Sequence, residues 1–212
     1  MDSRPTTHKV QLECPSVENL HDIFDTITYA KGSVCCRMLA SFCGEKFHAC
    51  LKVYFSQYAW GNATSQDLLK VCDQIVGSLD GVLPSEFLGA WLTQTGFPVL
   101  KVSVESGPDN SLIFTLTQRP FRDYPQNEPG CIWPLLLNMI DEEGNQKRLM
   151  MKEGELKFES DRLWWFNHQQ QGFYLCEYSS HDEFQRLCDS LHERKGFKQD
   201  HYSIFNSAQI FA

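Results

Sequence analysis

The sequence predicts an α+β chain of several domains, in which a helical unit precedes an all-β sandwich and the first helices of another helical domain. Apolar residues recur every three to four positions through the first part of the chain. At Phe97-Pro98 this period changes to two, which is typical of strands, and after Ser179-Ser180 the helical spacing returns. The expected domains are 1–96, 97–179 and 180–212.

Composition and charge exclude several classes of protein. The net charge of −8 argues against nucleic acid and against an anionic membrane surface as partners. The sequence contains no apolar run long enough for a membrane span, and Met1–Pro5 lacks the apolar stretch of a signal peptide. The nine cysteines are odd in number and scattered, with no Cys-x-x-Cys pair. We therefore expect a reduced protein in the cytoplasm.

The stretch around Tyr29 predicts the first helix of the chain. Asp25 is suited to cap its N-terminus, and Gly44 occupies the position at which helices commonly end. Tyr29 shares a helix face with small residues, namely Gly32, Ser33 and Cys36, whereas the opposite side carries Val34, Met38 and Phe42. We expect the apolar side to be buried and Tyr29 to border a cleft. The alternative is an ordinary buried tyrosine whose hydroxyl bonds to the backbone.

Three further helices are expected before residue 97. The first, over 45–59, places apolar residues at three-to-four spacing: Phe47, Leu51, Tyr54, Phe55 and Tyr58. Thr64 and Asp67 have the spacing of a capping box and start the next helix, whose apolar face is Leu68, Leu69, Cys72, Ile75 and Val76. Pro84 starts the last helix, which buries Phe87, Leu88, Trp91 and Leu92 and ends at Gly96.

Short alternating segments predict the strands of the sandwich. Two of them flank a turn at 107–110, and the segment Cys131–Ile140 is strongly apolar, with Pro134 indicating an edge strand or a bulge. Residues 141–145 are expected to form a hairpin turn. The expected strands are 99–104, 112–117, 131–140, 147–151, 155–158, 164–166 and 173–178. Two helices are expected within 180–212.

Several segments resemble the M1 zinc aminopeptidases, with the puromycin-sensitive type the most similar. The first is Tyr29-Ala30-Lys31-Gly32-Ser33, with Phe24-Asp25 before it and Arg37-Met38-Leu39 after it. The others follow in the family's order: Gly61-Asn62-Ala63-Thr64, Gly96-Phe97-Pro98-Val99-Leu100, Gln118-Arg119-Pro120-Phe121, Gly172-Phe173-Tyr174 and Asp200-His201-Tyr202. The resemblance implies that 1–96 is the helical C-terminal part of a thermolysin-like catalytic domain. It also implies that Tyr29 stabilises the oxyanion formed during peptide hydrolysis.

The family's metal-binding motif is absent from these 212 residues. The motif His-Glu-x-x-His requires two histidines four positions apart, and no two of the seven histidines have that spacing. The Met-Glu-Asn segment that binds the substrate's free amine in the family is also absent. Tyr29 is thus the one catalytic residue that the resemblance assigns here. Zinc is expected in the full-length family enzyme, and we expect none to be bound by this chain alone.

These observations favour a fragment of a zinc metalloaminopeptidase that removes N-terminal residues from peptides. Such a fragment would be inactive alone, and would pack against the missing zinc-binding half and a helical C-terminal domain. The alternative is a non-catalytic binding or scaffolding module derived from the same family. A cysteine hydrolase is a third and weaker hypothesis, because no cysteine has a recognisable nucleophile setting.

Overall fold

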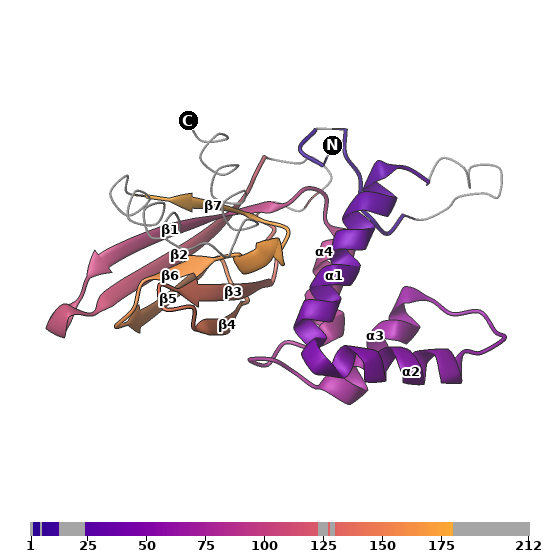
Figure 1. Ribbon diagram of the computed structural model, residues 1–212. Coiled ribbons are helices and arrows are strands. Elements are labelled where there is room, and N and C mark those ends of the chain that lie inside the picture. Colours follow the sequence, from indigo (N-terminus) through magenta and orange to yellow (C-terminus); the bar gives the residue numbers. More distant parts are fainter. Residues whose placement is uncertain (1, 5, 13–23, 123–126, 128–129, 180–212) are drawn as a thin grey trace. The chain divides into compact units, whose positions relative to one another are not determined.

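The structure is a computed structural model that describes residues 2–4, 6–12, 24–122, 127 and 130–179. Within this part, the chain divides into two compact units between Gly96 and Phe97, and Asn127 belongs to the first unit. Helices occupy the first unit and strands the second, which confirms the predicted α+β class (Figure 1). The segment 180–212, for which two helices were predicted, lies outside the described residues.

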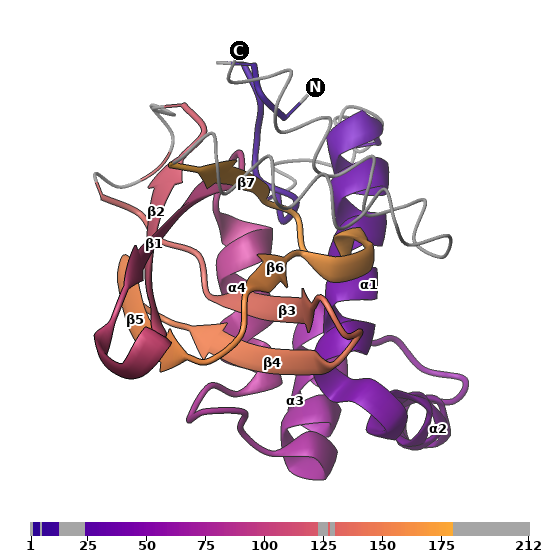
Figure 2. The same cartoon turned by 60° about the vertical axis from the view of Figure 1, so that its left-hand side comes forward.

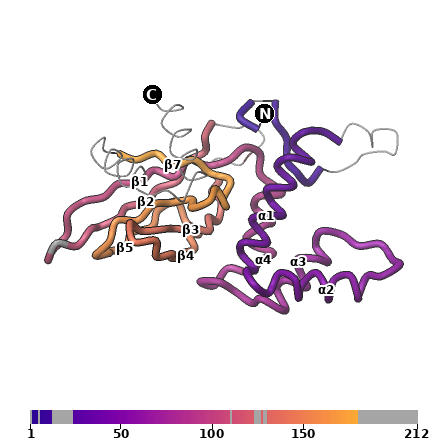
Figure 3. The backbone as a smooth tube through the Cα atoms, in the orientation of Figure 1, coloured from indigo at the N-terminus to yellow at the C-terminus, as the bar shows by residue number. Residues whose placement is uncertain are grey.

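Within its described residues, the helical unit contains four α-helices. They are α1 (Gly32–Cys43), α2 (Phe47–Gln57), α3 (Ser65–Val76) and α4 (Pro84–Thr93). A five-residue π-helix, Ile27–Lys31, leads directly into α1, and a 3-10 turn, Gly44–Lys46, joins α1 to α2. The backbone changes direction sharply at this 3-10 turn, as Figure 3 shows. Helix α4 packs against α1 and α3, and α2 packs against α3.

The local helix-start signals of the sequence act as predicted. Thr64 Oγ1 accepts a hydrogen bond from the Asp67 amide at 3.3 Å, and Asp67 Oδ2 accepts one from the Thr64 amide at 2.8 Å. This reciprocal capping box satisfies two donors that α3 cannot use internally. Pro84 occupies the first turn of α4, and Phe87, Leu88, Trp91 and Leu92 are all buried, as predicted.

The predicted apolar face of α2 is wrong at Phe55 alone, which is 66% exposed. The other four members, Phe47, Leu51, Tyr54 and Tyr58, are half-buried. The small Cys50 side chain has no exposed surface and faces inward where α1, α2 and α3 approach one another. Helix α4 also ends at Thr93 rather than at Gly96, which instead adopts a positive φ of 75° in the following turn.

In the part of the second unit that the structure describes, seven strands form two sheets (Figure 2). The strands are β1 (Pro98–Ser106), β2 (Leu112–Pro120), β3 (Leu135–Asp141), β4 (Gln146–Met151), β5 (Glu155–Ser160), β6 (Trp164–Phe166) and β7 (Leu175–Tyr178). One sheet has the order β5-β2-β1-β7 and the other β4-β3-β6. All pairs are antiparallel except β1 with β7, which run parallel.

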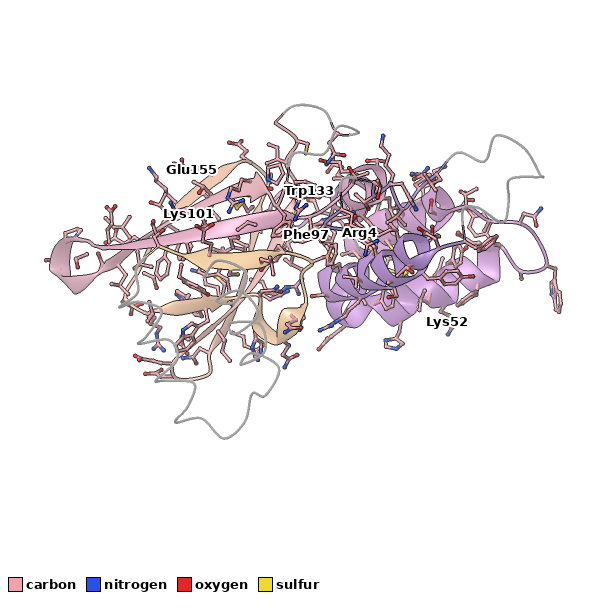
Figure 4. All side chains as sticks on the ribbon, turned by 90° about the horizontal axis from the view of Figure 1, so that it is seen from above. Arg4, Lys52, Phe97, Lys101, Trp133 and Glu155 are labelled. Carbon is pink, nitrogen blue, oxygen red and sulfur yellow. The ribbon has the colours of Figure 1, made fainter. Side chains whose placement is uncertain are left out.

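The two sheets enclose an apolar core. The Phe114 ring of β2 lies 6.1 Å from the Phe166 ring of β6, measured between centroids, so the sheets face each other. Trp133 is fully buried, whereas Lys101 on β1 and Glu155 on β5 point outward (Figure 4). Along β5, exposed and half-buried residues alternate, which is the period of two that predicted the sandwich.

Pro134 does not mark an edge strand or a bulge. Strand β3 begins one residue later, at Leu135, and is the central strand of its sheet. The missing amide of proline therefore lies just outside the ladder. The Gln118 side chain fixes the preceding backbone, because its Nε2 donates to the Trp133 carbonyl at 2.9 Å and its Oε1 accepts from the Trp133 amide at 3.0 Å.

Candidate functional site around Tyr29

The Tyr29 segment is a π-helical turn rather than the start of an ordinary α-helix. The Asp25 side chain caps it as predicted, since Oδ1 accepts from the Thr28 amide at 2.9 Å. The wider turn then runs over Ile27–Lys31 before α1 takes over at Gly32. Single π-turns insert one extra residue, redirect the side chains around them and occur often at functional sites. The spacing of apolar residues in the sequence did not predict this π-turn.

Tyr29 is an exposed residue, with 65% of its surface accessible. The buried-tyrosine alternative is therefore wrong. Its ring lies 6.2 Å from that of Phe24, which is also exposed, and its hydroxyl has no hydrogen-bond partner among the described residues. The opposite side of α1 buries Met38 and Phe42, as predicted. The phenol thus lies exposed, next to a helix whose other side is anchored in a core.

Lys31, two residues after Tyr29, is buried and fixes the end of the π-turn. Its Nζ donates to the Gln94 carbonyl at 3.0 Å and to the Gly96 carbonyl at 2.8 Å, and lies 3.0 Å from Asp2 Oδ2. The two carbonyls accept hydrogen bonds from the ammonium group, and the Asp2 carboxylate balances its charge. A buried lysine is tolerated only when paired in this way.

Asp2 completes this buried network from the N-terminal segment. Its Oδ1 accepts from the Thr7 hydroxyl at 2.6 Å and from the Gly96 amide at 3.1 Å. The π-turn, the N-terminal segment and the turn after α4 are therefore held together by one polar cluster, which comprises Asp2, Thr7, Lys31, Gln94 and Gly96. We call it the Lys31 cluster.

His8 holds the other end of the π-turn. Its Nδ1 lies 2.8 Å from the Lys9 carbonyl, and its Nε2 lies 2.7 Å from Asp25 Oδ2. Because a carbonyl and a carboxylate both accept hydrogen bonds, the two ring nitrogens each need a proton, and the imidazolium form fits this geometry. Burial lowers the pKa of His8, but the Lys9 carbonyl and Asp25 more than offset it and raise the pKa above its usual value.

The pKa of the Asp25 carboxylate is shifted in the opposite direction to that of His8. Its partial burial favours the neutral acid, yet the hydrogen bonds from Thr28 and His8 hold its pKa below the usual value. The sequence identified Asp25 as a helix cap and Lys31 as part of a motif, but not the partners of either. His8 and Asp2 lie far from Tyr29 in the sequence, so no local pattern could have indicated them.

The described residues do not form a catalytic zinc site. A catalytic zinc requires three protein ligands and an open position for water. Among residues 2–4, 6–12, 24–122, 127 and 130–179, one group of three potential ligands lies close enough to hold a metal, namely Cys43, Cys50 and Cys72, and all three are buried. His8 is held by Asp25, and His48 lies exposed on α2.

The cysteines of the described part carry free thiols. Burial raises the pKa of Cys35 and of Cys50 to about 11, and that of Cys176 still further. Groups with such values are protonated at neutral pH and are poor nucleophiles, which argues against the cysteine hydrolase hypothesis at these three positions. None of the described helices combines the length and the apolar character that crossing a bilayer requires.

Comparison with known proteins defines the class. Residues 1–87 match the peptidase family M1 domain. These residues include the Tyr29 turn and helices α1 to α3, and similarity to an aminopeptidase extends into the second unit, since it covers 84% of the chain. The first 87 residues of the chain therefore belong to peptidase family M1.

Individual relatives extend the similarity over most of the chain. The Tricorn protease-interacting factor F2 of Thermoplasma volcanium is 28% identical over 99% of this chain. The puromycin-sensitive aminopeptidase of Caenorhabditis elegans is 30% identical over 84% of it, and the alanine/arginine aminopeptidase of Saccharomyces cerevisiae is 28% identical over 84%. The chain spans 26%, 19% and 21% of these three relatives, respectively.

Proposed function

We propose that this chain serves the hydrolysis of N-terminal peptide bonds by a zinc aminopeptidase, and that Tyr29 stabilises the oxyanion. The observation that carries the proposal is an exposed phenol on a π-turn fixed at both ends. His8 and Asp25 hold one end of that turn, and the Lys31 cluster holds the other. Membership of family M1 and the names of the relatives support the same reaction class.

The role of Tyr29 follows from the charge that develops during hydrolysis. When a nucleophile attacks the carbonyl of a peptide bond, negative charge moves onto the carbonyl oxygen. A hydroxyl that donates to this oxygen stabilises the transition state more than the substrate, so it raises kcat. Such a donor must already be in position, and the anchors on both sides of Tyr29 provide that rigidity.

The zinc ion and the general base are proposed to come from residues outside this chain. The 212 residues hold no His-Glu-x-x-His motif, and the buried cysteine group is inaccessible to a peptide. We accordingly expect the isolated chain to show no peptidase activity. Peptides are its proposed ligands in the complete enzyme, and a zinc-binding domain and a further helical domain are its proposed packing partners. The cytoplasm remains the proposed location.

A non-catalytic binding or scaffolding module is the second candidate function, and the missing zinc motif is the observation that favours it. Two measurements separate the candidates. An in-frame His-Glu-x-x-His upstream of Met1 in the transcript supports the enzyme. A native protein whose mass matches that of the 212 residues, 24.5 kDa, supports the module.

The role of Tyr29 can be tested in a chimaera. The present sequence would replace the aligned segment of the C. elegans puromycin-sensitive aminopeptidase, and kcat and KM would be measured on an aminoacyl-coumarin substrate. We expect Tyr29→Phe to lower kcat by about 10²–10³ with a smaller change in KM. The matched control is Tyr58→Phe, which removes a hydroxyl that donates to Asp67 in the same unit and should leave kcat unchanged.

A further inference from the structure

Three helices bring three cysteines to one point in the helical unit. Cys43 is the last residue of α1, Cys50 lies near the start of α2, and Cys72 lies within α3. Their sulfur atoms all lie within 4.8 Å of one another. Cys50 and Cys72 have no exposed surface, and Cys43 is 5% exposed. This cysteine triad is distinct from the Tyr29 site, and the proposed peptidase reaction makes no use of it.

Ordinary core packing accounts for the triad only in part. A single buried cysteine behaves as a small apolar side chain. Here, however, each sulfur has two others beside it. No pair is joined in a disulfide. Three soft donor atoms from three separate helices therefore surround one point.

We propose that Cys43, Cys50 and Cys72 form a three-thiolate binding site for a monovalent copper ion. With a metal–sulfur bond of about 2.3 Å, three sulfurs in a trigonal plane around one ion stand roughly 4.0 Å apart. The sulfurs, all within 4.8 Å of one another, thus need to move closer by less than about 1 Å. Rotation of the cysteine side chains supplies a shift of this size without unwinding a helix.

The donor set selects the ion. Thiolates are soft ligands and prefer Cu(I), zinc and iron–sulfur clusters. Structural zinc almost always takes four ligands, but the described residues place no histidine, aspartate or glutamate in this group as a fourth. Burial also keeps water from filling that position. A soft ion that binds three sulfurs therefore fits this site better than zinc does, and Cu(I) is the physiological ion of that kind.

Copper binding exchanges the protons of the three thiols for the metal. On binding, each Cu–S bond replaces an S–H bond and the proton passes to solvent. Copper enters and remains in the +1 state, so no oxidant or reductant is consumed.

The test uses the complete 212-residue chain, reduced and free of oxygen, titrated with Cu(I) in competition with bicinchoninate. We expect one Cu(I) per chain to be retained against the chelator, with three sulfur ligands in its X-ray absorption spectrum. Cys72→Ala should weaken retention by about 100-fold or more, because losing a direct ligand costs at least as much as losing an outer partner. Two controls on α1, Cys35→Ala and Cys36→Ala, should retain copper like the unaltered chain.

A second measurement distinguishes loss of the copper site from loss of folding in the variants. The unaltered chain should unfold at a higher temperature with one equivalent of Cu(I), and Cys72→Ala should lose this rise while retaining its helical circular dichroism. Two-coordinate copper, or retention that is the same in Cys72→Ala as in the unaltered chain, would overturn the proposal. Failure of copper binding would leave the Tyr29 proposal untouched, since the two sites share no residue.

Discussion

Each unit of the molecule buries one carboxylate beside a basic side chain, but the two arrangements do different things. In the helical unit, Asp2 pairs with Lys31 and joins segments that are distant in the sequence. In the sandwich, Asp141 pairs with Arg162 and organises the hairpin turn that follows it. The first arrangement positions a candidate functional turn, and the second stabilises a local piece of fold.

The Asp141 arrangement shows how a local network satisfies a buried charge. Asp141 Oδ1 accepts from the amides of Glu143 and Asn145 at 2.9 and 2.7 Å, and Oδ2 lies 2.7 Å from Arg162 Nη1. Burial favours the neutral acid, but these hydrogen bonds outweigh it and lower the pKa of Asp141 to about 2. Most of its partners lie within four residues along the chain.

Breaking the long-range arrangement should have the largest effect. Lys31→Met leaves the Asp2 carboxylate buried and unpaired and deprives the Gln94 and Gly96 carbonyls of their donor. We expect the helical unit to lose about 3–5 kcal/mol of unfolding free energy, measured by urea denaturation. The matched control is Lys52→Met on the exposed side of α2, which should change it by less than about 0.5 kcal/mol. Equal effects of the two substitutions would show that the Lys31 cluster does not anchor the π-turn.

Breaking the Asp141 arrangement should have a smaller effect, and the stabilisation that it provides should depend on pH. Asp141→Asn retains a hydrogen-bonding side chain but loses the charge, so we expect a loss of about 1–3 kcal/mol. The folded-state pKa lies below the ordinary value of 3.8, so the stabilisation by Asp141 is present above pH 3.8. It is lost as the pH falls from there through about 2. Acid titration of the sandwich fluorescence should show this loss in the unaltered chain and a smaller one in the variant.

The His8–Asp25 pair should give a smaller effect near neutral pH. Both side chains are about one third exposed, at 30% and 38%, so we expect less than about 1 kcal/mol. The pKa of His8 is raised, so its contribution is complete below pH 6.5 and is lost as the pH rises through the folded value. The Asp25 contribution is lost as the pH falls below 3.8, because its pKa is lowered.

A pair of variants checks this pH dependence. The melting temperature of the unaltered chain should fall between pH 6 and 8, and His8→Gln should remove that fall. His48→Gln, on the exposed surface of α2, should leave it in place. A pH profile that is the same in the unaltered chain and in His8→Gln would mean that the pair does not carry a charge on His8.

Local signals in the sequence predicted much of the fold. The Thr64–Asp67 box, Pro84 at a helix start and the turn at Asp141 act through neighbours within four residues, and all three were predicted. The alternation of apolar residues predicted strands such as β2 and β5, whose successive residues differ in burial. Pro134 was misread because the sequence does not say where β3 begins.

The candidate site depended on contacts that no local pattern encodes. Lys31 reaches Gln94 and Gly96 across more than sixty positions, and His8 reaches Asp25 across seventeen. The cysteine triad likewise assembles from three helices, and the sequence had assigned Cys50 no role in the buried face of α2. The π-turn depends on how these long-range contacts hold its two ends. The resemblance to the family identified Tyr29 in the sequence, whereas only the structure identified the residues that hold its turn.

Tyr29 gives the smallest effect on stability and the most direct test of function. Because its side chain is 65% exposed, Tyr29→Phe should change the unfolding free energy by less than about 0.5 kcal/mol. The decisive measurement is the kcat of the Tyr29→Phe chimaera relative to the unaltered chimaera. We predict a fall of about 10²–10³ with the melting temperature unchanged. A kcat within about twofold of the unaltered value would contradict the assignment of Tyr29 as the oxyanion donor.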